Sequence, residues 1–144
     1  ALCKIKKTGI GKLTLGNLYA KRDWGYAKDY VNGMWMMMQH DTAEDWVLAT
    51  GKTQTVREFA EAAFKYVDLH WEDYVQTSEK YFRPNEVDYL LGDSTKARTK
   101  LKWEPKISFQ ELVQLMVDFD MKEAEREKVL IEKNLLKPTW ENPV

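Results

Sequence analysis

The chain has 144 residues, a length typical of one domain, and 44% of them are hydrophobic, which is enough to form a core. Its net charge of −1 argues against a nucleic-acid-binding protein, because general binders of polyanions carry an excess of basic residues. It contains one cysteine, Cys3, and no run of about 18 apolar residues, so we expect no internal disulfide, a reducing cytoplasmic location and no membrane span.

The first third of the chain predicts a strand followed by a helix. Residues 1–11 indicate the end of a helix that runs into a loop, and residues 12–18 alternate polar and apolar side chains as in a short strand. A helix begins at Ala27, because the apolar side chains recur at helical spacing: Ala27, Tyr30, Val31, Met34, Trp35 and Met38. Met36 and Met37 broaden this apolar face, so we expect the helix to be covered on two sides.

The middle of the chain predicts a buried strand and a capped helix. The apolar run Trp46–Thr50 is typical of a buried strand. Thr55 and Glu58 form a capping box, in which the threonine oxygen accepts one backbone N–H and the glutamate carboxylate accepts another. The helix that starts there presents one apolar face: Val56, Phe59, Ala60, Ala63, Phe64 and Val67. Residues 71–76 then indicate a second, partly exposed strand.

A loop and a short helix come next in the prediction. Proline, glycine and mixed polarity over residues 81–93 indicate a loop with short extended pieces. Asp93 or Ser94 then caps a short helix through Leu101, and Pro105 breaks it. The coarse order of strands and helices is that of an α/β protein.

The C-terminal part predicts one more amphipathic helix and a tail. Ser108 and Glu111 form a second capping box. The helix after it has an inward apolar face: Phe109, Leu112, Val113, Met116 and Phe119. Charges alternate in sign over residues 123–133, which indicates a solvated helix or a fraying tail, and residues 135–144 are expected to be extended.

Common catalytic and metal sites find little support in the sequence. His40 and His70 are far apart and lack a partner at ligand spacing, so we expect no metal site. The glycine-bearing segment 8–16 does not follow a strand and open a helix, as a dinucleotide-binding turn must.

Two arginines are the better candidates for binding. Arg22 lies beside Trp24 at a strand–helix junction, and Arg83 lies between Phe82 and Pro84. A guanidinium group binds two phosphate oxygens at once and keeps its charge when buried, so both residues suit a phosphate site. The alternative is that both only pair with nearby carboxylates: Asp23, Asp29, Glu86 or Asp88. From the residues alone both interpretations stay open.

Longer motifs carry a family resemblance. The segments "RDWGYAKDY", "RPNEVDYLLGDSTKA" and "LKWEP" occur in this order, within a match that runs from about Leu13 to Met121. In these segments the chain resembles the GDP-mannose 4,6-dehydratase family of extended short-chain dehydrogenases. Tyr19 departs from the family pattern at the rim of the expected guanine site. Tyr26 departs from it on the side expected to face the cofactor.

The resemblance implies a fold and a set of binding residues. Residues 1–122 would form a small mixed α/β substrate domain, with a helix and a strand that return to a Rossmann sheet formed elsewhere, and residues 123–144 a charged tail. It implies that Arg22 and Arg83 clamp the substrate's diphosphate and that Glu86 accepts hydrogen bonds from the ribose. Three further positions are implied to line the guanine end of the site: Gly16, Asn17 and Lys21.

The resemblance also implies an activity and its limits. The family converts GDP-mannose to GDP-4-keto-6-deoxy-mannose with NADP, and its complete members are expected to be homo-oligomers. The glycine fingerprint that binds NADP and the catalytic Tyr-x-x-x-Lys pair belong to an N-terminal half, which we expect upstream of this chain. We therefore predict that this chain binds the GDP moiety, contains no catalytic residue and is inactive alone. Two alternatives remain, a free-standing sugar-nucleotide binding module and an inactive, truncated assembly protein.

Overall fold

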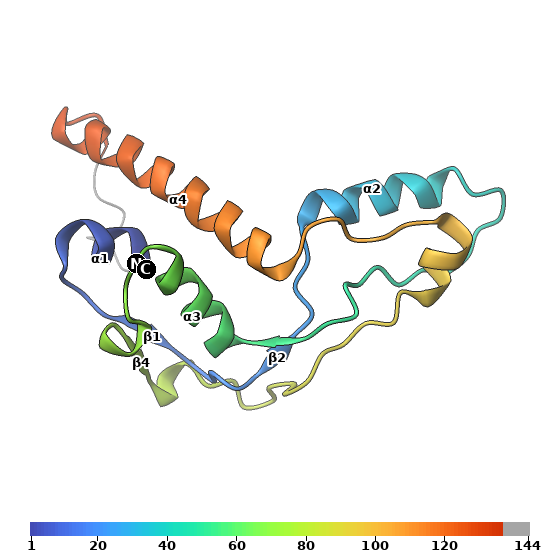
Figure 1. Cartoon of the computed structure of the whole chain (residues 1–144), viewed down its shortest axis with the longest axis horizontal. Coiled ribbons are helices and arrows are strands. Elements are labelled where there is room, and N and C mark those ends of the chain that lie inside the picture. The colour runs from blue at the N-terminus through green and yellow to red at the C-terminus, as the bar shows by residue number, and fades with distance from the viewer. Residues whose placement is uncertain (137–144) are drawn as a thin grey trace.

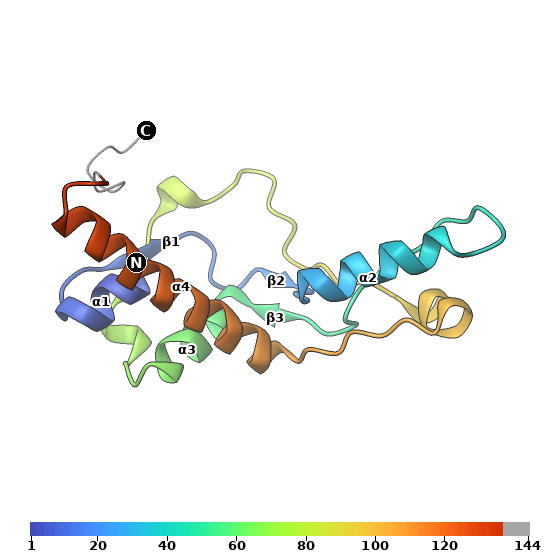
Figure 2. The ribbon, with the colours of Figure 1, turned by 90° about the horizontal axis from the view of Figure 1, so that it is seen from above.

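The chain forms a mixed α/β fold, as predicted, in a computed structural model that describes residues 1–136 (Figure 1). The helices and strands are α1 (Leu2–Thr8), β1 (Leu13–Leu15), β2 (Lys21–Arg22), α2 (Ala27–Met38), β3 (Gln54–Thr55), α3 (Val56–Tyr66), β4 (Val75–Thr77) and α4 (Phe109–Glu132). Short helical turns occupy Trp71–Asp73, Glu79–Tyr81 and Ala97–Leu101. The molecule is elongated in Figures 1 and 2, with α1, α3 and α4 towards one end and α2 towards the other.

The strands form two small sheets of two strands each. β1 pairs with β4 in parallel, and Leu13 is opposite Val75. β2 pairs with β3 in antiparallel fashion, and Lys21 also forms a parallel bridge with Tyr89. β2 therefore lies between β3 and the segment around Tyr89, which is the predicted loop. This arrangement determines what surrounds Arg22, at the end of β2.

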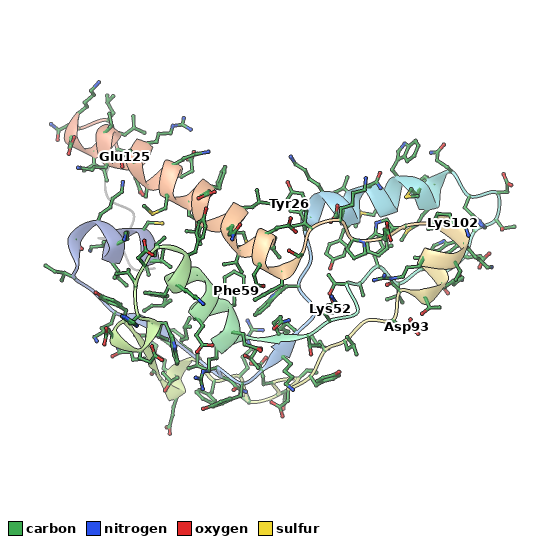
Figure 3. The ribbon with its side chains drawn as sticks, viewed as in Figure 1. Tyr26, Lys52, Phe59, Asp93, Lys102 and Glu125 are labelled. Atoms are coloured by element: carbon green, nitrogen blue, oxygen red, sulfur yellow. The ribbon has the colours of Figure 1, made fainter. Side chains whose placement is uncertain are left out.

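The first core lies between α3 and α4. Its buried members alternate at helical spacing on the two helices: Ala63, Val67, Val113 and Val117. Both predicted capping boxes are confirmed, with Thr55 and Ser108 accepting N–H groups of Glu58 and Glu111 over 3.0 and 3.3 Å. Figure 3 shows Phe59 on α3 near the start of α4, where its ring meets that of Phe109 edge-on.

The second core lies under α2 and is formed by Ala97, Leu101 and Trp103. Trp103 is 1% exposed, and its indole N–H donates to the backbone oxygen of Asp29 over 2.8 Å. A Cβ at Gly33 would lie 2.9 Å from that indole nitrogen, so glycine lets α2 approach the ring closely. Trp103 is thereby fixed between α2 and the short helix that precedes it.

Part of the predicted apolar face of α2 is exposed within residues 1–136, although Tyr30 of that face packs on the second core. Four of its members are more than half exposed: Val31, Met34, Trp35 and Met38. The packed side instead presents Gly33, Met36 and Met37 to the second core. The helix is covered on one side within residues 1–136, because Trp103 fills that side and nothing described lies over the other.

The segment predicted as a strand, Trp46–Thr50, forms no ladder within residues 1–136, and the sheet to which it was expected to return is not part of this chain. The backbone groups of a strand need hydrogen-bond partners, and here side chains bind the backbone at the two ends of the segment. Arg98 donates to the Thr50 oxygen over 3.0 Å, and Lys96 donates to the Asp45 oxygen over 2.8 Å. The segment is extended but held by side chains from the turn at 95–101.

Three smaller predictions need correction or refinement. Of the strand predicted at 71–76, only the end is a strand, because residues 71–73 form a helical turn. The short helix ends at Lys102, whose left-handed backbone (φ 57°) stops it before Pro105. Met116 and Phe119 on α4 are exposed, because Val117 occupies the contact with α3.

The end of the chain bears on the predicted tail. α4 crosses from residue 122 to 123 without a break and reaches Glu132, so residues 123–132 take the helical alternative. The separate tail over 123–144 stays a prediction, and the extended segment predicted at 135–144 lies outside the described residues beyond 136. No helix within residues 1–136 has the length and apolar character needed to cross a membrane.

Candidate functional site

The candidate site is built around Arg22 and Glu86, which form an ion pair across 64 residues of sequence. Arg22 Nη1 also donates to the backbone oxygens of Lys21 and Val87, over 2.8 and 2.6 Å. The side chains of Arg22 and Glu86 are 22% and 19% exposed, so water reaches both. The ion pair is one of the pairings that the sequence left open.

Unused polar atoms remain on both members of the pair. A guanidinium group has five N–H donors, and three of those of Arg22 are used. Its Nε–H and one Nη2–H therefore find no acceptor within residues 1–136. Glu86 uses Oε1 for Arg22, and its Oε2 accepts no hydrogen bond from the described part of the chain. The pair is thus fixed in place yet able to bind a further donor and acceptor.

Arg83 lies three residues before Glu86 on the same loop and is exposed. It makes no hydrogen bond or ion pair with any other residue between 1 and 136, so the pairing alternative does not describe it. The Arg22–Glu86 pair and the bridge from Lys21 to Tyr89 lay this loop along β2. The structure brings Arg22 and Glu86 together; Arg83 stays on the adjoining, open stretch of the loop.

The three remaining predicted residues lie just before and within β2. A Cβ on Gly16 would lie 2.4 Å from the backbone oxygen of Tyr81, so glycine is needed here for contact with the loop. The Asn17 side chain accepts the N–H of Tyr19 over 2.9 Å and fixes a turn. The ammonium group of Lys21 lies 6.0 Å from the ring centroid of Tyr89.

Asp23 is a residue of this site that sequence reasoning treated only as a pairing partner for an arginine. It instead accepts hydrogen bonds from two other segments, through the amides of Thr50, Gly51 and Gly92 and the Thr50 hydroxyl. It lines an open hollow of about 360 Å³ beside Arg22. The other lining residues are mostly apolar: Trp24, Tyr30, Val47, Leu48, Ala49, Leu90, Leu91 and Gly92. Burial raises the pKa of Tyr30 in this hollow, and the charges of Asp23 and Asp29 raise it further.

Two more residues of the segment "RDWGYAKDY", Trp24 and Asp29, have structural contacts. Asp29 is buried and accepts the backbone N–H groups of Lys106 and Ile107, over 2.9 and 3.2 Å. Trp24 stacks on Phe109, with ring centroids 6.1 Å apart. A carboxylate in the first turn of a helix, as Asp29 is in α2, is favoured by the helix dipole. The donors to Asp29 and to Asp23 both come from segments distant in sequence, so neither set of contacts has a sequence signal.

A second hollow, of about 740 Å³, lies between α3 and the start of α4. It is lined mainly by polar side chains, Glu58, Glu61, Lys65, Asp68, His70 and Glu72 among them. The indole N–H of Trp71, which also lines it, is buried without a partner within residues 1–136. No group of three histidine, cysteine or acidic side chains in that part of the chain is close enough to hold a metal ion.

Comparisons with known proteins agree on one family. The sequence profile described as GDP-mannose 4,6 dehydratase matches residues 1–116. The chain is 51% identical over 130 residues to GDP-mannose 4,6 dehydratase 1 of Arabidopsis thaliana, covering 90% of this chain and 36% of that protein. It is 45% identical over 137 residues to the Homo sapiens GDP-mannose 4,6 dehydratase, covering 81% of this chain and 37% of the other. The chain thus spans little more than a third of these relatives.

A solved structure supports the fold. RMD from Pseudomonas aeruginosa, complexed with NADPH, matches 85% of this chain and 40% of its own, with a TM-score of 0.75. The two sequences are 15% identical, so this likeness concerns the fold alone.

Proposed function

The chain belongs to the GDP-mannose 4,6-dehydratase family, as its motifs indicated, and from that premise we propose that it holds the GDP end of GDP-mannose in such an enzyme. In this proposal the chain is the C-terminal part of an NADP-dependent lyase that converts GDP-mannose to GDP-4-keto-6-deoxy-mannose. The residues of this part bind and orient the substrate, and those that carry out the reaction lie outside it. A homo-oligomeric, cytoplasmic enzyme remains part of the proposal.

The observation that carries the proposal is the pair of fixed, incompletely used groups at Arg22 and Glu86. The two remaining N–H donors of Arg22 suit the oxygens of a diphosphate, which charge-assisted hydrogen bonds bind strongly. The unused Oε2 of Glu86 suits a ribose hydroxyl, a donor that a carboxylate accepts. In GDP-mannose the diphosphate is bonded directly to a ribose. The adjacent side chains of Arg22 and Glu86 therefore match adjacent parts of the ligand, the diphosphate and the ribose.

Arg83 and the residues before β2 extend this match. The exposed guanidinium of Arg83 has all its donors free of described partners, so it suits the second side of the diphosphate. Gly16 lets the backbone approach Tyr81 closely, and Asn17 fixes the turn that follows, in the place proposed for the guanine. Lys21, at the edge of β2, adds a positive charge beside them. Binding energy gained here would orient the sugar for reaction elsewhere in the enzyme.

The residues described do not fit an NADP site. A dinucleotide-binding turn leads from a strand into a helix, whose N-terminus holds the phosphates. The glycine-bearing segment 8–16 runs in the opposite order, from α1 into β1. The binding of NADP therefore falls to parts of the enzyme beyond this chain. By the same reasoning we propose that the chain alone is inactive.

Calorimetric titration of GDP-mannose into the chain tests the proposal. Replacing Arg22 or Arg83 by alanine should weaken binding by about 1.5–3 kcal/mol, the range for hydrogen bonds to charged groups. Arg126→Ala is the matched control, because Arg126 is an exposed arginine on α4 whose ion-pair partner is Glu123. Binding should also weaken as salt is added. Equal losses in all three variants, or no heat from the unsubstituted chain, would contradict binding by this segment.

A second candidate, an assembly role, rests on the exposed apolar face of α2. Val31, Met34, Trp35 and Met38 together present apolar surface that soluble domains usually cover. Sedimentation of the chain distinguishes the two roles. Self-association that persists in Arg22→Ala and disappears in Trp35→Glu would favour assembly, whereas a monomer that binds GDP-mannose would favour the binding role.

A further inference from the structure

Asp23 connects three segments that surround Arg22. Its Oδ1 accepts the backbone N–H and the hydroxyl of Thr50, over 2.9 and 2.5 Å. Its Oδ2 accepts the N–H groups of Gly51 and Gly92, over 3.0 and 3.3 Å. Both carboxylate oxygens are therefore used, in contrast to those of Glu86, and one side chain ties together residues 23, 50–51 and 92.

The loop that carries Glu86 is held against β2 at successive points. Arg22 binds Glu86 and the Val87 oxygen, and the Lys21 backbone exchanges hydrogen bonds with Asp88 and Leu90, over 2.7 and 3.1 Å. Asp23 adds the last contact of this series, at Gly92. The pairing of the loop with β2 thus begins with a bond made by Arg22 and ends with one made by Asp23.

Arg22 and Asp23 are adjacent but bind different partners. Arg22 contacts residues 86–87, and Asp23 contacts residues 50–51 and Gly92. Thr50 is itself fixed, because Arg98 donates to its backbone oxygen over 3.0 Å and to the buried hydroxyl of Ser94 over 3.0 Å. The backbone that carries Arg22 is therefore anchored through the neighbouring Asp23.

We propose that Asp23 is a positioning residue, which holds Arg22 and the Glu86 loop in the geometry that binds the diphosphate of the nucleotide sugar. The effect on nucleotide binding rests on the proposed function, whereas the hydrogen bonds of Asp23 do not. A guanidinium that is free to turn would lose rotational freedom on binding, whereas one already held by its backbone and neighbours would not. Loss of Asp23 should therefore act on the nucleotide through Arg22.

Asp23→Asn tests the proposal in the 144-residue chain, because the amide keeps the size of the side chain and replaces one acceptor by a donor. Asp29→Asn is the matched control. Asp29 likewise accepts two backbone N–H groups, those of Lys106 and Ile107, at the second core. A merely structural effect would appear in both variants, and a positioning effect in Asp23→Asn alone.

The first readout is the NMR signal of the Arg22 Nη protons, which are separate when a guanidinium is held and averaged when it rotates freely. We expect separate signals in the unsubstituted chain and in Asp29→Asn, and averaged signals in Asp23→Asn. Thr50→Val, a milder change that removes only the hydroxyl bonded to Asp23, should broaden them and serves if Asp23→Asn does not fold. Unchanged Arg22 signals in a folded Asp23→Asn chain, or equal averaging in Asp29→Asn, would overturn the proposal.

The second readout is the affinity for GDP-mannose, which we expect to fall at least tenfold in Asp23→Asn and to change much less in Asp29→Asn. If the unsubstituted chain binds no GDP-mannose, the proposed function fails while the Arg22 signals still decide the positioning role. If GDP-mannose binds equally well to the unsubstituted chain and Asp23→Asn, Asp23 has no positioning role in binding.

Discussion

Glu86 binds the guanidinium of Arg22 although the two are 64 positions apart in sequence, and it does so through one carboxylate oxygen. A salt bridge between partly exposed groups contributes little to stability by itself. Its effect here is geometric, since it closes the loop that carries Arg83 onto β2. It also means that a phosphate approaching Arg22 meets a charge that is already partly balanced.

Replacing Glu86 by glutamine should separate its two effects on binding. The neutral side chain no longer balances Arg22, so the affinity for inorganic pyrophosphate should rise. The loss of the charged acceptor for the ribose should lower the affinity for GDP relative to pyrophosphate by about tenfold. Calorimetric titration with each ligand gives the two affinities. Glu79→Gln, in the helical turn Glu79–Tyr81 and outside the pair, is the control. An unchanged ratio for Glu86→Gln would exclude a contact with the ribose.

Gly92 and Ala49 should tolerate exchange with each other better than either tolerates change alone. A Cβ on Gly92 would lie 2.2 Å from the Cβ of Ala49, which is buried. Gly92→Ala should therefore destabilise the chain by about 1–3 kcal/mol, as overpacking does. Adding Ala49→Gly removes the clash and should restore part of this loss. Urea unfolding of both single variants and the double variant measures the coupling, and simple additivity would disprove the close contact.

The two capping boxes should make stability depend on acid pH. Hydrogen bonds from Thr55 lower the pKa of Glu58, and those from Ser108 lower the pKa of Glu111, both below the ordinary value of 4.5. A lowered pKa in the folded state stabilises the chain above the unfolded pKa, and this contribution is lost as the pH falls through the folded pKa. The free energy of unfolding should therefore decrease below about pH 4.5. Denaturant unfolding at several pH values should show a shallower decrease in Glu58→Gln/Glu111→Gln.

The cap itself should also matter at neutral pH. Thr55→Ala removes the oxygen that accepts the Glu58 N–H over 3.0 Å and should cost about 0.5–2 kcal/mol of unfolding free energy. Thr55→Ser keeps that oxygen and is the control.

Glu44 should titrate at an unusually low pH. Hydrogen bonds from Lys96 first, and then from Lys100, lower its pKa from 4.5 to about 2. The ammonium groups lie 2.7 and 2.9 Å from its carboxylate oxygens. Carboxyl-carbon NMR should locate this midpoint, and Lys96→Ala should move it upward, as should added salt. Lys122→Ala, on α4, should leave it in place, and a midpoint near 4.5 in the unsubstituted chain would contradict the ion pairs.

How far the sequence predicted the fold depended on whether the interaction was local. The helix starts at Thr55 and Ser108 were predicted because each cap is formed within four residues. The strand predicted at Trp46–Thr50 has no ladder within residues 1–136, because a ladder depends on a partner that hydropathy does not reveal. On α4, Phe119 and Val117 both fit an apolar pattern, and only the position of α3 decides between them.

The site shows the same division. The residues alone left four carboxylates as possible partners of Arg22, and the contact with Glu86 follows from the path of the loop along β2. The motifs provided the family, which the profile match and the relatives confirm, while the binding roles of the individual residues stay predictions. Asp23 could not be assigned from sequence, because the amides it accepts, at residues 50, 51 and 92, belong to segments that only the fold brings near.

The parallel pairing of β1 with β4 has a consequence for synthesis on the ribosome. Thr14 hydrogen-bonds to Gln76, 62 residues further on, so β1 emerges long before its partner exists. At 5–20 residues per second this delay is about 3–12 s. During that time the edge of β1 is open to other chains, and its short length of three residues limits how firmly they can attach.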